Sequence, residues 1–191
     1  MSGLLAVGYF LFVLFFSLLT FLLWARIALR YVHVSAVHPV SQSINILCNP
    51  IVTPLTRLFP PKKGRANRYD WHCFLILVGV ELLKFIVIGP LFLGAMLSPV
   101  LMLIYTIADL IVQPCNLLFY AILIRVIMSW VNPRWQNPLA DVLQRVTEPV
   151  LKPARQAIPI ASGIDFSPFV VMIILKVITL FITASLPLQL I

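Results

Sequence analysis

The chain has 191 residues, of which 61% are hydrophobic and only 10% are charged. This balance excludes an ordinary soluble globular fold, in which about a quarter of the residues would be charged. The formal net charge of +8 requires no nucleic-acid partner, because loops retained on one side of a membrane and attracted to anionic lipid account for it.

Four apolar stretches are long enough to cross a bilayer, whose hydrocarbon core of about 30 Å requires roughly 20 residues. The first of them lacks a basic leading region and is too long for a signal peptide, so we expect it to remain as a span. The sequence therefore predicts an all-α membrane protein with four transmembrane helices. The spans are expected at about 4–31, 71–93, 100–131 and 166–186.

Basic residues lie on one side of these spans. The two long loops, 32–70 and 132–165, carry several Lys and Arg residues, whereas the link 94–99 and both chain ends carry none. By the positive-inside rule, both loops face the cytoplasm and both termini face outward.

The densest basic run lies between the first and second spans. It comprises Lys62, Lys63, Arg65 and Arg68. Such a run beside the cytoplasmic end of a span attracts anionic headgroups. We therefore expect membrane lipids to be partners of this segment, which has no equivalent in the second half of the chain.

Residues 24–60 recur at 123–159, shifted by 99 positions. Proline fixes φ and removes a backbone donor, so matched prolines indicate a shared backbone shape. The repeat indicates duplication and predicts a first repeat at 1–97 and a second at 98–191, which are parallel and related by a pseudo-two-fold axis along the membrane normal. The matched pairs are Arg26 with Arg125, Pro39 with Pro138, Pro50 with Pro149, Pro54 with Pro153, and Pro60 with Pro159.

Each long loop contains an amphipathic segment, which begins at Pro39 in one copy and at Pro138 in the other. Apolar residues three and four apart form one face of a predicted helix. This helix lies either in the headgroup plane or against the protein, and the pattern leaves both open. The proline pairs that start at Pro50 and Pro149 predict that each helix stops there and that a turn-rich path follows.

An aspartate precedes the second and the fourth span, and each is placed to cap a helix N-terminus. These residues are Asp70 and Asp165. Pro168 falls in the first turn of the fourth span, where proline is tolerated. Trp71 and Phe166 follow the caps as aromatic residues of the membrane interface. A four-residue insertion in the first copy reduces the offset from 99 to 95 at this point.

The second copy reads Glu148-Pro149-Val150-Leu151-Lys152-Pro153, then Pro159, then Gly163-Ile164-Asp165-Phe166-Ser167-Pro168. This pattern resembles the YggT family of integral membrane proteins, in its double-repeat form, over essentially the whole chain. The first copy is similar over 49–55 but departs from the family between Pro61 and Tyr69, where the Gly-Ile-Asp approach is lost.

The resemblance implies a location in the bacterial inner membrane. It also implies a loose association with osmotic or extracytoplasmic stress and, in other lineages, with cell division and haem-protein maturation. It implies no catalytic residues.

Ionisable residues within the predicted spans are candidate functional residues, because charge at membrane depth is costly. Glu81 and Lys176 each lie 11 residues after a capping Asp, about 16 Å deep. They can form a structural ion pair between the copies or a proton- or cation-responsive gate. Alternatively, Glu81 pairs with Lys84 at i,i+3. We expect Asp109 nearer the outer interface.

Arg26 and Arg125 are matched charges near the cytoplasmic ends of the first and third spans. One expectation is that their guanidinium groups reach lipid phosphate. The other is that Arg26 pairs with Asp70 and Arg125 with Asp165, which would clamp the two spans of each repeat together.

The sequence indicates no catalytic, cofactor or metal site. It contains neither a nucleophile–base pair nor a Gly-rich phosphate loop, and its three cysteines form no CxxC motif. We expect a non-catalytic protein with a basic, proline-rich cytoplasmic interface that acts with an unidentified protein partner in stress response or membrane-complex assembly. The alternative is a subunit of a small ion channel or transporter. Assembly as a homo-oligomer stays open.

Overall fold

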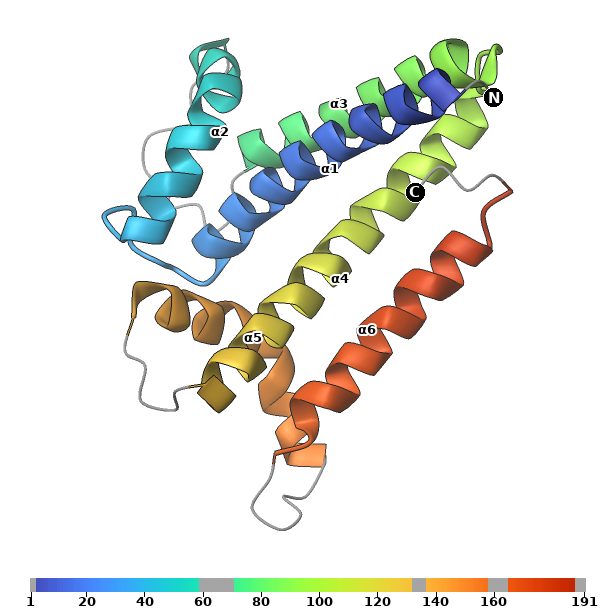
Figure 1. The fold of residues 1–191 in the computed structure, drawn as a ribbon. Helices are drawn as coiled ribbons and strands as arrows, with labels where there is room; N and C mark the ends of the chain where they lie inside the picture. The colour runs from blue at the N-terminus through green and yellow to red at the C-terminus, as the bar shows by residue number, and fades with distance from the viewer. Residues whose placement is uncertain (1–2, 59–70, 132–136, 158–164, 188–191) are drawn as a thin grey trace.

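The structure, a computed structural model, describes residues 3–58, 71–131, 137–157 and 165–187. In these ranges it is all-helical and contains no strand, which confirms the predicted fold class at that level. The elements are α1 (Gly3–Tyr31), α2 (Pro39–Leu58), α3 (Trp71–Ile88), the short π-helix η1 (Gly89–Leu93), α4 (Pro99–Val131), α5 (Pro138–Ala157) and α6 (Ser167–Ala184) (Figure 1).

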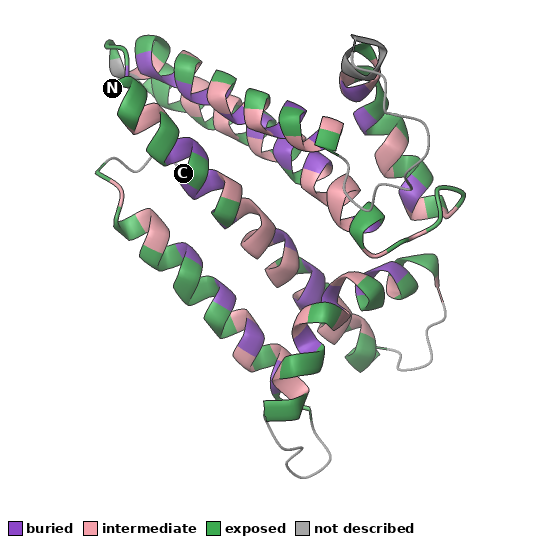
Figure 2. Cartoon of the chain, turned by 180° about the vertical axis from the view of Figure 1, so that it is seen from behind, coloured by how far each residue is buried: buried purple, intermediate pink, exposed green. Residues whose placement is uncertain are grey.

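Four of these helices are long and apolar enough to cross a membrane, and they coincide with the four predicted spans. Helix is the expected form, because it satisfies every backbone donor and acceptor within the segment when no water is available. Many large apolar residues of the spans are exposed in the isolated chain, and Figure 2 shows exposed residues recurring along these helices. Lipid contact accounts for that exposure.

The two shorter helices pass through their prolines. α2 continues through Pro50 and Pro54, and α5 through Pro149 and Pro153, so the prediction that these residues end the helix is wrong. A four-residue spacing places both prolines on one face of the helix. The missing hydrogen bonds therefore fall on one side, and a bend can absorb them. Figure 1 shows α5 changing direction along its length.

The two halves of the chain repeat the same order of long helix, short helix and long helix. Figure 1 shows α1 and α4 running in the same direction, with α2 and α5 at the end where these two helices finish. We call this the loop end of the bundle. α4 packs against α1, α3, α5 and α6, and is therefore the central helix.

Each half has its own hydrophobic core near the loop end, and the two cores use matched positions. Leu23, Val52 and Ile76 are buried together between α1, α2 and α3. Ile122, Leu151 and Val171 are buried together between α4, α5 and α6. The members of these pairs lie 99, 99 and 95 residues apart, the same offsets that relate the two copies in the sequence.

The link between the halves is a tight turn at the opposite end of the bundle. Gly94 has φ of 69°, in the left-handed region that favours glycine. At Gly89 an added Cβ would lie 3.0 Å from the Ala95 carbonyl oxygen and 3.1 Å from the Leu97 nitrogen. The turn therefore depends on both glycines and brings the end of α3 beside the start of α4.

Candidate functional site

Three ionisable side chains meet between α3 and α4. Lys84 Nζ lies 3.4 Å from Glu81 Oε2 on the same helix and donates a hydrogen bond to Asp109 Oδ2 on α4. Exposure is 0% for Glu81, 1% for Lys84 and 0% for Asp109. We call these three residues the charge cluster. Opposite charges at hydrogen-bond distance offset part of the cost of burying each one.

The charge cluster lies near the middle of the bundle. Glu81 is 10 residues from the start of α3 at Trp71, and Asp109 is 10 residues from the start of α4 at Pro99. Each is therefore about 15 Å from its helix start, at 1.5 Å per residue, and the two helices begin at opposite ends of the bundle. That depth corresponds to the centre of a hydrocarbon core about 30 Å thick.

The pairing within the spans differs from part of the sequence prediction. The Glu81–Lys84 contact at i,i+3 is present. The expected Glu81–Lys176 pair is absent from the described residues, where Lys176 Nζ instead lies 5.6 Å from the ring centroid of Phe119. The expectation for Asp109 is wrong, because this residue is buried on the face of α4 that packs against α3.

A cavity of about 630 Å³ lies beside the charge cluster, and Lys84 and Asp109 form part of its wall. Apolar side chains such as Leu14, Phe21 and Val112 also line it, and we call it the polar cavity for the polar groups gathered there. Gln113 Nε2 donates a hydrogen bond of 3.3 Å to Asp109 Oδ1 within it. Its other polar side chains come from α1, α4 and α6. They are Ser17, Asn116, Tyr120, Lys176, Thr179 and Thr183.

The spacing of polar residues in the sequence indicates this polar cavity, although no single span shows it clearly. On α4 the polar residues recur at i, i+4 and i+7 from Asp109, and on α6 at i, i+3 and i+7 from Lys176. Both spacings place the side chains on one face of a helix. Each span alone carries few polar groups, but the packing of α1, α4 and α6 turns those groups toward one space.

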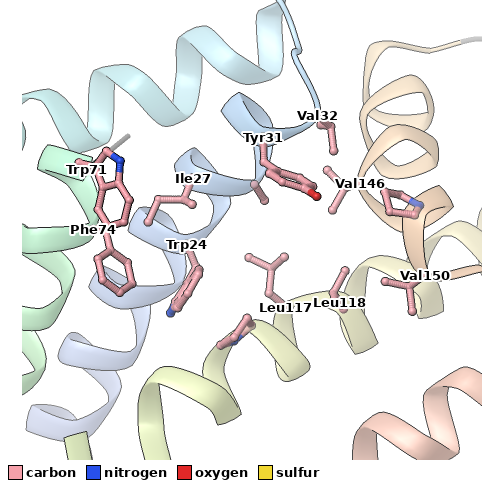
Figure 3. A pocket seen from close by; sticks show the side chains of 13 residues that line it. Trp24, Ile27, Tyr31, Val32, Trp71, Phe74, Leu117, Leu118, Val146 and Val150 are labelled. Carbon is pink, nitrogen blue, oxygen red and sulfur yellow. The ribbon is translucent and has the colours of Figure 1, made fainter. Parts of the chain in front are cut away.

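A second cavity, of about 500 Å³, lies between the two halves and is almost wholly apolar. Figure 3 shows aromatic and aliphatic side chains of α1, α3, α4 and α5 around it. They include Trp24, Tyr31, Phe74, Leu118 and Val150. This lining suits hydrocarbon and offers almost nothing to a charged or strongly polar ligand, so the polar cavity is the candidate functional site.

The matched arginines hold the short helices at the loop end. Arg26 donates a hydrogen bond of 3.1 Å to Asn49 Oδ1 of α2. Arg125 donates bonds of 3.2 Å to Glu148 Oε2 and 2.7 Å to Thr147 Oγ1 of α5. Asn49 and Glu148 are themselves matched at the offset of 99. The same contact therefore recurs in both copies.

The predicted clamp between Arg125 and Asp165 is wrong. Asp165 Oδ2 accepts a hydrogen bond of 2.8 Å from Arg155 Nε, and Arg155 also donates to Glu148 Oε1 at 3.0 Å. Arg155 competes successfully because α5 continues past its prolines as a helix and places this residue beside the start of α6. The corresponding pair of Arg26 with Asp70 lies outside the described residues.

Asp165 is not the N-cap residue of α6 as predicted, because Phe166 holds that position, but Asp165 lies directly before it. Its Oδ1 accepts the Ser167 N–H at 3.0 Å, at the first residue of α6. Partial burial acts to raise the pKa of this carboxyl, but hydrogen bonds from Arg155 and Ser167 and the charge of Arg155 outweigh it, so the pKa lies below its usual value. Pro168 lies in the first turn of α6, as predicted.

The two halves also touch at the loop end. His38 Nε2 of the first half lies 3.9 Å from Asp141 Oδ2 of α5, and Arg145 Nε donates to the same carboxylate oxygen at 3.0 Å. Several predicted motif and lipid-contact residues lie outside the described residues. They are Pro60, Lys62, Lys63, Arg65, Arg68, Asp70, Pro159 and Gly163.

No metal site is found in the described part of the chain, where no three or more His, Cys, Asp and Glu side chains are grouped to hold an ion. Cys48 and Cys73 are buried and Cys115 is partly buried, and all three are free thiols. Among the described residues, ionisable groups converge in the charge cluster and in the loop-end network of Arg125, Glu148, Arg155 and Asp165, and the charge cluster is the buried one.

Comparison with known proteins gives a family match to both halves. The CCB3/YggT family model matches residues 5–91 and again residues 101–186. The chain is 30% identical over 166 residues to the uncharacterized protein YggT of Escherichia coli K12, covering 86% of this chain and 82% of that protein. It is 30% identical over 150 residues to an uncharacterized protein of Haemophilus influenzae, with coverage of 78% and 77%. No solved structure matches.

Proposed function

We propose that this multi-pass membrane protein, which belongs to the CCB3/YggT family, binds a small ion in the polar cavity. It would act as a subunit of a small channel or transporter. The observation that carries the proposal is the charge cluster, buried at mid-span on the wall of that cavity. Apolar residues would pack there at less cost, so charge at this depth points to function.

Comparison of the two halves supports the polar cavity over the loop end. The repeated residues, such as Arg26 and Arg125, hold α2 and α5 against the spans and are explained by that structural role. Asn116 of α4 corresponds to Ser17 of the first copy, and both line the cavity, but two other polar residues of α4 there are not repeated. Asp109 and Gln113 correspond to Phe10 and Leu14 of the first copy at the offset of 99.

The proposed orientation places both loops on the cytoplasmic side and both termini outside, in a bacterial inner membrane. The basic residues of 32–70 and 132–165 support it through the positive-inside rule. In this orientation the two halves are parallel repeats about an axis normal to the membrane, and the matched cores support that relation.

Ion flux through the purified protein in liposomes tests the proposal. We expect flux above that of empty liposomes, and a several-fold loss of it in Lys176→Gln, because this change removes a charge from the cavity. The matched control is Lys152→Gln, the same substitution at an exposed position of α5, which should leave the flux unchanged. Folded protein that gives no flux would refute the proposal.

A second candidate function is that of an accessory protein whose loop end presents a basic interface to anionic lipids or to a protein partner in stress response or membrane-complex assembly. The observation that favours it is that α2 packs against α5, and that His38, directly before α2, lies beside Asp141 of α5, so the two short helices form one surface. A photo-crosslinker at exposed Gln144 of α5 tests it. Reproducible crosslinks to one partner in native membranes would support this function, and crosslinks to lipid alone would restrict it to lipid binding.

Both candidate functions are non-catalytic. They differ in which part of the chain matters, since the first depends on α3, α4 and α6 at mid-span and the second on α2 and α5. Variants in the polar cavity and variants at the loop end therefore separate them.

A further inference from the structure

We propose that the charge cluster is a proton-binding site in which Glu81 holds one proton and exchanges it with the polar cavity. This inference rests on the proposed function and names the ion that the cavity handles. It follows from the charge count, from the unequal hydrogen bonding of the two carboxyl groups, and from the position of the cluster on the cavity wall.

The charge count leaves one negative charge unbalanced. Two carboxyl groups, of Glu81 and Asp109, share the single ammonium group of Lys84. If both were ionised, the buried cluster would carry a net charge of −1 at mid-span. An unbalanced charge in an environment of low polarity is costly, and two carboxylates that share one site commonly hold a proton between them. One proton makes the cluster neutral.

The hydrogen bonds show which carboxyl group takes the proton. Both oxygens of Asp109 accept hydrogen bonds, Oδ2 from Lys84 and Oδ1 from Gln113. Only Oε2 of Glu81 accepts one, at the longer distance of 3.4 Å, and its buried Oε1 has no hydrogen-bond partner. Each hydrogen bond that a buried carboxylate accepts favours its charged form, so the carboxyl group with fewer and weaker donors takes the proton. Asp109 is therefore the ionised member and Glu81 the neutral one.

Among the described residues, the groups around Glu81 on neighbouring helices do not supply a second positive charge. α4 contributes Asp109 and the buried phenol of Tyr105, and α1 contributes the phenol of Tyr9 within electrostatic range of Lys84. Lys176 of α6 lies on the cavity wall and faces the ring of Phe119. The proton on Glu81 is what balances the cluster.

The wall of the polar cavity provides the route for exchange. Asp109 and Lys84 line the cavity, and Glu81 lies behind them on α3. Because Asp109 is buried from water in this structure, exchange requires the wall to open locally. A hydronium ion then gives a proton to Asp109 and leaves as water. Lys84 then passes a proton from its ammonium group to Glu81 and takes one from Asp109, so that it regains its charge. The net result is one proton added to Glu81 and none lost elsewhere.

Infrared spectroscopy of the purified protein in liposomes at neutral pH tests the inference, because a protonated carboxyl group absorbs separately from a carboxylate. We expect a protonated-carboxyl band in the unmodified protein and its loss in Glu81→Gln. Asp165→Asn, which removes a surface carboxyl of lowered pKa, should retain the band. Absence of the band, its survival in Glu81→Gln, or its appearance only when Na⁺ and K⁺ are removed would overturn the inference.

Thermal unfolding supplies a second measurement that does not depend on the band. Glutamine has the shape of a neutral glutamic acid, so Glu81→Gln should unfold within about 2 °C of the unmodified protein. Asp109→Asn removes the ionised partner of a buried lysine and should unfold at least about 6 °C lower. Equal losses in the two variants, or failure of Glu81→Gln to fold, would show that Glu81 is ionised and would overturn the inference.

The flux assay distinguishes this inference from the proposed function. If Lys176→Gln lowers the flux but the unmodified protein lacks the protonated-carboxyl band, ion transport is upheld and the proton site is overturned. The band without any flux would uphold the proton site and overturn transport. If both hold, the flux should depend on pH in the unmodified protein and lose that dependence in Glu81→Gln.

Discussion

The two halves of the chain are alike at the loop end and differ at mid-span. Arg26 with Asn49, and Arg125 with Glu148, make the same contact between a long and a short helix. At mid-span the matched positions at the offset of 95 hold opposite charges, Glu81 in α3 and Lys176 in α6. Duplication has thus kept the contacts that build the scaffold, while the charged positions inside the membrane have changed.

The halves also depend on each other at mid-span. Lys84 belongs to the first half, and Asp109, the carboxylate to which it donates, belongs to the second. The loop-end core of the second half is internal to that half, whereas Leu110 of α4 packs on the loop-end core of the first half. A further buried cluster of Phe85, Ile88, Leu97 and Tyr105 contains residues of both halves. The halves are therefore joined at mid-span by apolar packing and by an ion pair, and Lys84 has one carboxyl partner in its own half and one in the other.

The largest effect is expected where the halves share a charge. Lys84→Met leaves Asp109 buried without its cation, which we expect to cost about 3–5 kcal/mol of the free energy of unfolding. Chemical or thermal unfolding in detergent measures the loss. The double variant Lys84→Met/Asp109→Leu removes both charges and should recover much of the stability. A Lys84→Met protein as stable as the unmodified one would show that the cluster does not join the halves.

A smaller effect is expected at the matched arginines, and it should be unequal. Arg125→Ala removes hydrogen bonds to the charged Glu148 and to Thr147, which we expect to cost about 1–2 kcal/mol at this partly exposed site. Arg26→Ala removes a bond to the neutral Asn49, and about 0.5–1 kcal/mol is expected. Limited proteolysis of α2 and α5 compares the two variants. Greater loosening of α2 than of α5 would contradict this ranking.

The next effect is a pH dependence confined to the second half. The folded-state pKa of Asp165 is lowered. The contribution of this carboxylate to the free energy of unfolding is therefore complete above the unfolded-state pKa of about 3.9. It is lost as the pH falls through the lower folded-state pKa. Asp165→Asn should cost about 0.5–1 kcal/mol at neutral pH, allowing for its partial exposure. The difference in melting temperature between the two proteins should vanish at acid pH. A constant difference would contradict the lowered pKa.

The smallest effect is a gain. Asn49→Glu gives the first half the carboxylate that the second half has at Glu148, facing Arg26 at the matched position. We expect a stabilisation of about 0.5 kcal/mol, since partly exposed ion pairs are worth little. Melting curves at low and high salt measure it, and the gain should shrink at high salt. A loss of stability would mean that the two sites differ in more than the residue at this position.

Much of the fold can be predicted from the sequence because it rests on local features. Long apolar runs give the four spans, Pro39 and Pro138 begin the two short helices, and Asp165 accepts the first N–H of α6. The course of α2 and α5 through their prolines could not be predicted, because contacts with other helices there offset a local preference to break.

The site was less predictable than the fold because it depends on how the helices face one another. Charge and depth identify Glu81, Lys84 and Lys176 as unusual, but no local feature shows which face of α4 packs against α3. That face brings Asp109, expected at the interface, to Lys84. The helical spacing of Asp109 with Gln113 does show that one side of α4 is polar, and this signal becomes meaningful only once α1 and α6 are placed around it.

The order in which the cluster is synthesised has a consequence for biogenesis. Lys84 precedes Asp109 by 25 residues, so α3 leaves the ribosome and meets the insertion machinery before its main ionic partner has been translated. At that moment Glu81 is the acceptor within reach on the same helix, and a lysine at a helix centre opposes insertion by about 2.5–3.5 kcal/mol. Stable insertion of α3 therefore requires α4. Because the turn at Gly94 is tight, α4 follows α3 closely in the chain and is translated soon after it.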